Sequence, residues 1–493
     1  MLTNKLTLAE AFAYLPGQLS LFSLTLIASL VISGCVSTNG ITHDQTLREP
    51  IALGAQAKFD AWPSEPWWQA MQDPTLNHLI ELALKDNPSI VQAAKRLDKS
   101  KAYVGDAKSV LSAQVTANAE VSHQRLSENA FYPPPYGGSY QNIANATLNA
   151  SWDLDFWGKN RSALQAALSQ TEAAKAEQAA TKLLVSTLVA QTYYQLARQI
   201  EQQQLAYQAL EQREHELKLI KTRIDTGLDT NVELEQGQGN IYSAKVDVEA
   251  ATEAINLTRN ALAALTVQKP QALDDVQPRL PTFNSQALPD DVPIDLISRR
   301  PDLAAAKAVV NTASAYIDSA KAEFYPNLSL SAFVGLSSFG LSKFLELGSI
   351  VVGAGPALHL PIFDAGRLRA NLQAKNADLD IAIASYNAVL LQAVNDVADQ
   401  MTSVKSVRRE FGDQQAALHA AELAYRLASI RYEIGLTNYL AVLTAENTLL
   451  RERSRLINLQ ARSLALNIAL IKSLGGGFNL QQAVSSAQLD ATK

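Results

Sequence analysis

Apolar and polar residues alternate in four segments of the chain. Between Ile143 and Phe156 the even positions are apolar, whereas the odd positions from 145 to 155 are Asn, Thr, Asn, Ser, Asp and Asp. This period of two predicts a strand at about 143–156 with one apolar and one polar face. Similar alternation predicts strands at about 113–123, 327–336 and 349–362, although Pro356 in the last one cannot donate a ladder hydrogen bond. Each segment approaches the length that a tilted strand needs to cross a bilayer.

Long stretches without glycine or proline follow the second and fourth strand segments. Residues 161–226 contain neither residue and are rich in Ala, Leu, Gln, Glu and Lys, which favour helix. At 1.5 Å per residue, such a helix measures about 100 Å, too long to fold up inside a compact domain. Residues 367–434, interrupted once by Gly412, and 436–474 form comparable stretches. The corresponding segment of the first half, 228–269, contains Gly237 and Gly239, so we expect a local distortion of the helix there. Their apolar positions lie on more than one side, which favours neighbours on both sides over a two-stranded coiled coil.

The two halves of the chain repeat one another. Asn87-Pro88 corresponds to Arg300-Pro301, and the segment 223–228 corresponds to 431–436. The sequence therefore predicts two copies of one unit, each with a helix, two strands, a long helix, a tight turn and a further helix. We place the copies at residues 76–267 and 293–474, with a linker at 268–292.

An apolar segment near the N-terminus ends at Cys35, the only cysteine. Residues 19–34 carry no charge; they are short for a transmembrane helix but suit a secretory signal peptide, which we place at 1–34. Ile32-Ser33-Gly34-Cys35 resembles a bacterial lipobox, in which the cysteine is acylated, for example with palmitate, and becomes the first residue. An ordinary signal peptide with an incidental cysteine is the alternative.

Composition and motifs exclude several classes of protein. Apolar residues make up 47% and charged residues 18%, which argues against a disordered chain, and a net charge of −6 argues against nucleic-acid binding. One cysteine cannot form a disulfide or a thiolate metal site within the chain. The sequence holds no HExxH, GxSxG or phosphate-loop motif, so we expect no catalytic residues, metal or cofactor, and no enzyme activity.

Four strands are too few to close a membrane barrel, which needs about eight. An open sheet edge in lipid would leave backbone groups unpaired at a cost of several kcal/mol each. If these strands cross a membrane, several chains must therefore share one barrel. A soluble sheet with one buried face is the alternative.

Three motifs spread along the chain indicate a family. They are Trp67-Trp68 before Asp73-Pro74, the segment Arg299-Arg300-Pro301-Asp302-Leu303, and the segment 360–367 with the sequence LPIFDAGR. Together they resemble the TolC-like outer membrane factors, in the lipoprotein branch. The resemblance implies an α+β membrane protein with two internal repeats: a homotrimer with a 12-stranded outer-membrane β-barrel, four strands per chain, continued by a long periplasmic α-helical barrel. Residues 35–75, 268–292 and 475–493 would form an equatorial belt.

The resemblance implies the outer membrane channel of a tripartite efflux system in a Gram-negative bacterium. Such a channel would be lipid-anchored in the outer membrane and extend into the periplasm. It would passively carry drugs, toxic compounds or metal ions from an RND-type inner-membrane pump and a periplasmic adaptor (membrane fusion) protein to the exterior. A type I protein-secretion duct and a non-channel periplasmic coiled-coil scaffold lipoprotein are the alternatives.

The two tight turns between helices are the candidate functional sites, because Gly227 and Gly435 can take the left-handed conformation that such turns need. The resemblance implies that the adaptor docks on these tips, at Arg223, Gly227, Leu228, Arg431, Gly435, Leu436 and Thr437. It also implies a gate latch between Tyr432 and Glu233. Ala441 and Thr444 stand where the family often carries aspartate rings, so we expect side-chain hydrogen bonds to hold the gate closed.

Overall fold

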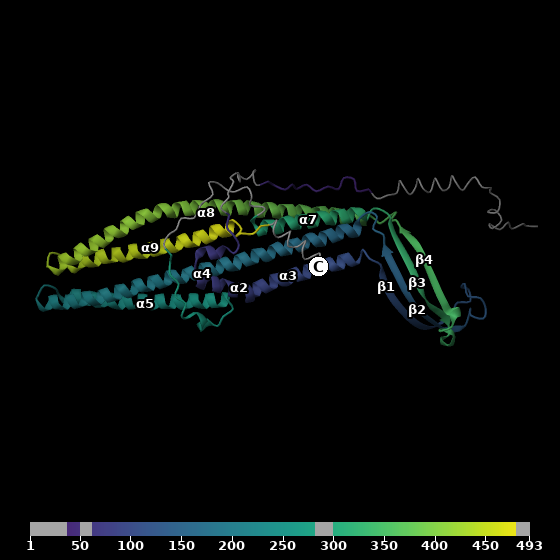
Figure 1. Ribbon diagram of the computed structural model, residues 1–493, viewed down its shortest axis with the longest axis horizontal. Helices are drawn as coiled ribbons and strands as arrows, with labels where there is room; N and C mark the ends of the chain where they lie inside the picture. Colours follow the sequence, from purple (N-terminus) through teal and green to yellow (C-terminus); the bar gives the residue numbers. More distant parts are fainter. Residues whose placement is uncertain (1–36, 50–61, 282–298, 480–493) are drawn as a thin grey trace, which may run out of the picture. The chain divides into compact units, whose positions relative to one another are not determined.

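A computed structural model of the protein describes residues 37–49, 62–281 and 299–479 (Figure 1). The predicted signal peptide and the predicted lipidation site, Cys35, lie outside the described residues. The first half contains α2 (Pro74–Asp86), α3 (Pro88–Ser109), β1 (Gln114–Arg125), β2 (Tyr140–Asp153), α4 (Lys159–Asp225) and α5 (Asn231–Leu265). The second half contains α7 (Pro301–Ala322), β3 (Asn327–Phe339), β4 (Ile350–His359), α8 (Arg367–Glu433) and α9 (Tyr439–Ser473). The short 3-10 helix η2 (Trp67–Met71) precedes α2.

The internal repeat is present in the structure with matching element lengths. Helices α3 and α7 both have 22 residues, α4 and α8 both have 67, and α5 and α9 both have 35. Each copy therefore has the predicted order of helix, two strands, long helix, tight turn and helix. The absence of glycine and proline from 161–226 correctly predicted the longest element of the first copy.

The described residues form two compact units. The sheet unit comprises the described parts of 1–46, 99–171 and 308–384, and the helical unit those of 47–98, 172–307 and 385–493. Helices α3, α4, α7 and α8 contribute residues to both units. The sheet unit holds all four strands, and the helical unit holds both tight turns.

The four strands form one antiparallel sheet in the order β1-β2-β3-β4 (Figure 1). The register aligns the apolar rows across the sheet: Ala117 pairs with Leu148, Leu148 with Val334, and Val334 with Val352. One face is therefore apolar across all four strands, as the period of two predicted. The opposite face carries mostly Asn, Gln, Thr and Ser side chains, together with Glu120 and three glycines.

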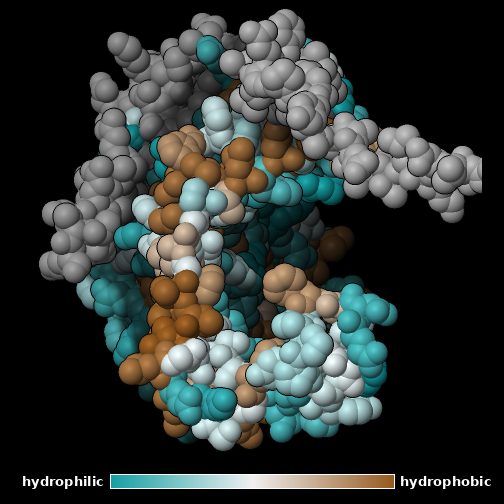
Figure 2. Space-filling view, turned by 90° about the vertical axis from the view of Figure 1, so that its right-hand side faces the viewer, coloured by the Kyte–Doolittle hydropathy of each residue, from teal (hydrophilic) through white to brown (hydrophobic). Residues whose placement is uncertain are grey.

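The apolar face of the sheet is largely uncovered by the rest of the chain. Its large side chains remain 41–75% exposed in Val115, Val121, Leu148, Trp152, Leu330, Val334, Ile350, Val352 and Leu358. Figure 2 shows apolar side chains gathered in a band on the side of the molecule that faces the viewer. An uncovered apolar surface of this extent is typical of a face that contacts lipid or another protein.

Strands β2 and β4 end before the predicted boundaries at 156 and 362. Asp155 has a left-handed backbone (φ +43°), which no strand can accommodate, and Gly158 follows at φ +78°. The side chain of Asp155 accepts hydrogen bonds from the backbone N–H groups of Asn160 and Arg161, so it caps the start of α4. Asp364 does the same for Leu368 near the start of α8. The aspartates that follow β2 and β4 therefore cap the helices that come next, and this is why the strands end early.

Pro356 lies inside β4, opposite Leu330 of β3. Among the described residues β4 pairs on one side only, as does β1, so both are edge strands. A proline without an N–H group is tolerated on an edge strand, because its missing donor can face away from the partner. Pro356, which argued against a strand at 349–362, is thus compatible with the position of β4 at the edge of the sheet.

Gly237 and Gly239 predicted a local distortion in the helix after the first turn, and this prediction is wrong. Helix α5 runs through both positions without a break. A Cβ atom at Gly237 would lie 3.0 Å from Leu217 and 3.2 Å from Ile220 of α4. The glycine therefore allows close approach of the two helices.

The core of the helical unit explains the opening motif of the chain. Trp67 is buried and donates from Nε1 to the Ser186 hydroxyl of α4 at 3.1 Å. Asp73 caps α2 by accepting from Thr75 and Leu76 N–H groups, and the Tyr193 hydroxyl donates to its other oxygen at 2.8 Å. Around them α2 packs with α4, α5 and α9 in a cluster that includes Leu76, Ile80, Val189, Leu262 and Ile468.

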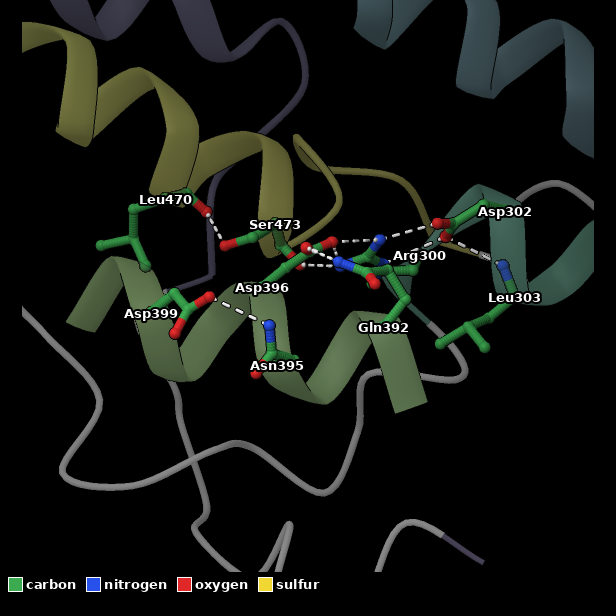
Figure 3. Close-up of polar contacts among 9 residues, drawn as sticks. All are labelled: Arg300, Asp302, Leu303, Gln392, Asn395, Asp396, Asp399, Leu470 and Ser473. Carbon is green, nitrogen blue, oxygen red and sulfur yellow. Dashed lines mark hydrogen bonds and ion pairs between the residues drawn. The ribbon is translucent and has the colours of Figure 1, made fainter. Parts of the chain in front are cut away.

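Arg300 fastens three helices of the helical unit together (Figure 3). Its guanidinium is 8% exposed and donates to both oxygens of Asp302 at 3.1 and 2.7 Å, at the start of α7. It also donates to Asp396 of α8 at 3.2–3.3 Å and to the backbone carbonyl of Ser473, at the end of α9, at 3.2 Å. The planar fork of arginine suits this set of acceptors.

One described helix, α8, contains a stretch long and apolar enough to cross a membrane by length and composition alone. This is weak evidence for a span, because the core helix of a soluble protein passes the same test.

Candidate gate and docking site at the helical tips

Both tight turns are closed by the same backbone arrangement. Leu228 N–H donates to the Arg223 carbonyl at 2.8 Å and Gly227 N–H to the Ile224 carbonyl at 2.9 Å. Leu436 and Gly435 repeat these contacts with the carbonyls of residues 431 and 432, at 2.7 and 3.0 Å. These are Schellman motifs, which require a left-handed residue, and Gly227 and Gly435 supply it with φ of +72° and +79°.

Exposed apolar side chains surround the two turns. Leu228 is 62% exposed and Leu436 is 65% exposed, and Val232, Ile434 and Leu440 are exposed to similar extents. Arg431 is also exposed, and Thr437 is half-buried. Exposed apolar residues at the end of a helical hairpin form a surface suited to a protein partner.

Arg223 differs from its repeat equivalent Arg431, because it is buried beneath the turns. Its guanidinium bonds both carboxylate oxygens of Asp229, at 2.9 and 3.2 Å, and donates to the Tyr432 carbonyl at 2.9 Å. It also lies 4.2 Å from the centre of the Tyr432 ring. The hydrogen bonds that Arg223 donates to the Asp229 carboxylate raise the pKa of Arg223 despite its burial. Arg223 therefore holds the two hairpins together and has little surface to offer a partner.

The structure gives Tyr432 a different partner from the one predicted. Its hydroxyl donates to a carboxylate oxygen of Asp229, not to Glu233. Burial and the neighbouring Asp229 raise the pKa of Tyr432, which keeps the hydroxyl protonated as a donor. We call Arg223, Asp229 and Tyr432 the latch; it joins the α4–α5 hairpin to the α8–α9 hairpin.

Glu233 is occupied in capping its own helix. Its carboxylate accepts from the Thr230 N–H at 2.8 Å, and the Thr230 hydroxyl accepts from the Val232 N–H at 3.2 Å. This capping box lowers the pKa of Glu233, chiefly through its hydrogen bonds with Thr230. The Thr-x-x-Glu spacing of residues 230–233 could have excluded Glu233 as the latch carboxylate and left Asp229, which directly follows Leu228.

Ala441 and Thr444 lie in the first two turns of α9 and bring no carboxylate to the tip. The Thr444 hydroxyl donates to the Leu440 carbonyl at 2.7 Å, within its own helix. Among the residues that the structure describes, no cluster of three or more His, Cys, Asp or Glu side chains could hold a metal ion.

The sheet and the helical hairpins define the class of this protein. It belongs to the outer membrane efflux protein family. The sequence profile of this family matches residues 79–267 and 292–476.

Individual relatives match over most of their length. The chain is 33% identical over 466 residues to the multidrug resistance outer membrane protein MdtP of Escherichia coli O6:H1, covering 92% of this chain and 95% of that protein. It is 34% identical over 364 residues to the fusaric acid resistance protein FusA of Burkholderia cepacia, covering 71% and 68%. It resembles the crystal structure of VceC from Vibrio cholerae with a TM-score of 0.80 and 36% identity, covering 85% of this chain and 100% of that one.

These comparisons identify an efflux channel of the outer membrane that extends into the periplasm. Its fold is that of the trimeric outer membrane efflux channels, with the four-stranded sheet and long helices predicted from the sequence.

Proposed function

We propose that three copies of this chain form one channel, the outer membrane component of a tripartite efflux system. The observation that carries the proposal is the single apolar face across β1–β4, bounded by two edge strands. In lipid the free edges of β1 and β4 would leave N–H and C=O groups unpaired, so β1 of one chain pairs with β4 of the next. Three sheets of four strands then close as a 12-stranded barrel.

The two faces of the sheet assign the two environments of the barrel. The apolar face, with Leu148 and Val352, contacts lipid, and the polar face, with Asn118, Glu120 and Asn149, lines a water-filled duct. Such a wall offers hydrogen bonds in every direction and selects weakly among solutes. We assign the chain the passive transport of drugs and other toxic compounds, in line with the multidrug and fusaric acid resistance of its relatives, and no catalysis.

The latch is the gate of the closed channel in this proposal. Arg223, Asp229 and Tyr432 join the α4–α5 hairpin to the α8–α9 hairpin, so separating the hairpins at the tip requires these contacts to break. A hydrogen bond to a charged group contributes about 1.5–3 kcal/mol. Losing the Tyr432 hydroxyl should therefore shift the closed–open equilibrium roughly ten- to a hundredfold toward open.

Single-channel conductance in planar bilayers tests the gate. We expect Tyr432→Phe and Asp229→Asn to open more often than the wild type, and Glu233→Gln, which alters only a helix cap, to match the wild type. Equal conductance of Tyr432→Phe and wild type would remove the latch from the gate. A trimer that never conducts would favour a scaffold lipoprotein over a channel.

The exposed tips are the docking surface for the periplasmic adaptor, which connects the channel to an inner-membrane pump of the RND type. Leu228 and Leu436 provide its apolar contacts, Arg431 and Thr437 its polar ones, and the glycines shape the turns. Arg223 contributes by holding the turns in place. We further propose that Cys35 carries the lipid anchor.

Drug resistance in cells tests the docking surface. We expect Leu436→Ser to lower resistance while leaving the trimer intact, because the side chain is exposed in the chain. Leu345→Ser is the matched control, since Leu345 is 85% exposed in the connection between β3 and β4. Loss of the trimer in Leu436→Ser, or equal loss of resistance in both variants, would contradict docking at the tip.

A further inference from the structure

A second polar cluster lies buried between the same hairpins. Glu216 of α4 is 7% exposed and Glu446 of α9 is fully buried. Arg213 of α4 lies 3.3 Å from Glu446 through its Nε atom. The hydroxyls of Tyr425 of α8 and Tyr439 of α9 donate to the two carboxylate oxygens of Glu216, at 3.0 and 3.4 Å. We call these five residues the acid cluster.

The acid cluster holds two carboxylates and one cation. Arg213 is the cation, and the neighbouring helix α5 adds only neutral groups: the Asn240 amide, 3.4 Å from the Tyr439 hydroxyl, and the Asn240 carbonyl, which accepts from Arg213 at 3.1 Å. The Oε2 atom of Glu446 has no hydrogen-bond partner among the described residues. A buried carboxylate oxygen without a partner is costly, and a neutral carboxylic acid reduces that cost.

The surroundings of Glu446 favour its protonated form. Burial, followed by the negative charge of Glu216, raises the pKa of Glu446 to about 7, and Arg213 only partly opposes them. The tyrosines stay neutral, since burial raises the pKa of both Tyr425 and Tyr439. Glu446 is therefore the member of the cluster that titrates near neutral pH.

The acid cluster is in direct contact with the latch. The rings of Tyr439 and Tyr432 lie 5.9 Å apart, centre to centre, and both are almost completely buried. Ile220 and Val442 complete the small apolar core around them. The contacts Arg213–Glu446, Tyr425–Glu216 and Tyr439–Glu216 all join the α4–α5 hairpin to the α8–α9 hairpin, so separation of the hairpins at this level breaks them.

We propose that Glu446 is a proton-binding site, occupied while the hairpins are closed and vacated when they separate. This inference rests on the proposed function, in which the hairpins separate to open the channel. Opening exposes the carboxyl to water, where it ionises like an ordinary glutamate. Protons then act as a ligand of the closed state.

The direction of the pH effect follows from which state binds the proton more tightly. The closed state has the higher pKa at Glu446, so protonation stabilises it, and opening becomes easier as pH rises from about 5 to about 7.5. A shift from 4.5 to about 7 predicts that the open–closed ratio increases roughly twentyfold between pH 5.5 and 7.5.

The test compares single-channel opening of the reconstituted trimer at pH 5.5, 6.5 and 7.5 for wild type, Glu446→Gln and Glu452→Gln. Glutamine mimics the protonated acid, so Glu446→Gln should keep the low opening frequency of wild type at pH 5.5 across the whole range. Glu452 is the matched control on the same helix. Its carboxylate accepts from Gln414 at 2.9 Å and pairs with Arg455, contacts that lie within the α8–α9 hairpin and lower its pKa. Glu452→Gln should therefore keep the wild-type pH response.

Infrared spectroscopy of the closed trimer tests the proton site without reference to the gate. The carbonyl band of a protonated carboxylic acid should be present at pH 6, fade by pH 8.5, and be missing in Glu446→Gln. A wild-type pH response that persists in Glu446→Gln, or a wild-type trimer without this band, overturns the proposal. The gate itself is judged separately: a Tyr432→Phe channel that opens no more often than wild type contradicts the latch, while the infrared band still decides whether Glu446 holds the proton.

Discussion

Leu148 and Asn149 are neighbours on β2 that the proposed barrel places in different environments. Leu148 is at the centre of the apolar row that runs from Ala144 to Trp152, and 52% of its surface is exposed in the single chain. Four residues of a tilted strand place it about 10 Å from either end of this row, near the middle of the membrane. Asn149 faces the opposite side, where its amide donates to Thr147 at 3.0 Å.

Arginine at these two positions should therefore have very different effects. At mid-membrane depth on the lipid face, Leu148→Arg should cost about 2–4 kcal/mol per chain, which lowers the folding equilibrium about 30- to 900-fold. Asn149→Arg points into water and should fold nearly as well as wild type. Both variants add the same side chain one residue apart on the same strand, so effects of the added charge and of the intrinsic strand preference of arginine cancel.

Folding into lipid vesicles, followed by urea titration and by gel mobility of the unheated trimer, measures this difference. We expect Leu148→Arg to show little trimer and a lower urea midpoint, and Asn149→Arg to keep both near wild type. Equal behaviour of the two variants would refute a lipid-facing apolar side of the sheet. A larger loss in Asn149→Arg would mean that the polar face is the one packed against other groups.

Three further predictions concern the helical unit and are measured by chemical denaturation in detergent. Arg300→Ala should lower the free energy of unfolding by about 2–3 kcal/mol. This is at the low end for a broken buried ion pair, because Asp302 and Asp396 are partly exposed. Arg300→Lys should recover only part of this loss, and an Arg300→Lys variant as stable as wild type would contradict the role of Arg300 in joining the three helices. Gly412→Ala should raise the free energy of unfolding by about 0.5–1 kcal/mol, since Gly412 lies inside α8 with open space around it. Gly475→Ala should prevent folding, because its Cβ atom would lie 1.8 Å from the Arg299 carbonyl oxygen at φ +88°, and a stable Gly475→Ala protein would show that this approach can relax.

Periodicity predicted the sheet well because it reports the environment of each side chain directly. The alternation in β2 identified both faces, and the register of the structure extends them across four strands. Strand ends were less predictable, because Asp155 adopts a left-handed backbone to cap α4. Proline and glycine were harder to interpret from the sequence, because each has more than one structural role. Pro356 marks an edge strand of the sheet, and Gly237 allows a close contact between α4 and α5 instead of distorting α5.

The tip was predicted in outline and wrong in one pairing, for reasons that local sequence does not resolve. The repeat predicted both turns and both glycines, which depend only on neighbouring residues. It could not distinguish Arg223 from Arg431, because the burial of Arg223 depends on Tyr432, 209 residues away. The latch carboxylate also depends on this long-range contact, and Glu233 was the wrong choice because it was already committed to Thr230.

The two unpaired edges of the sheet also bear on how the protein must be made. β1 and β4 are 12 and 10 residues long, and each presents a row of backbone groups ready to pair with any extended chain. A single chain released into the periplasm thus exposes two strand edges that can pair with other chains, beside a large apolar surface. Insertion into the membrane and joining of three copies should therefore be a single concerted event, whose rate depends steeply on chain concentration.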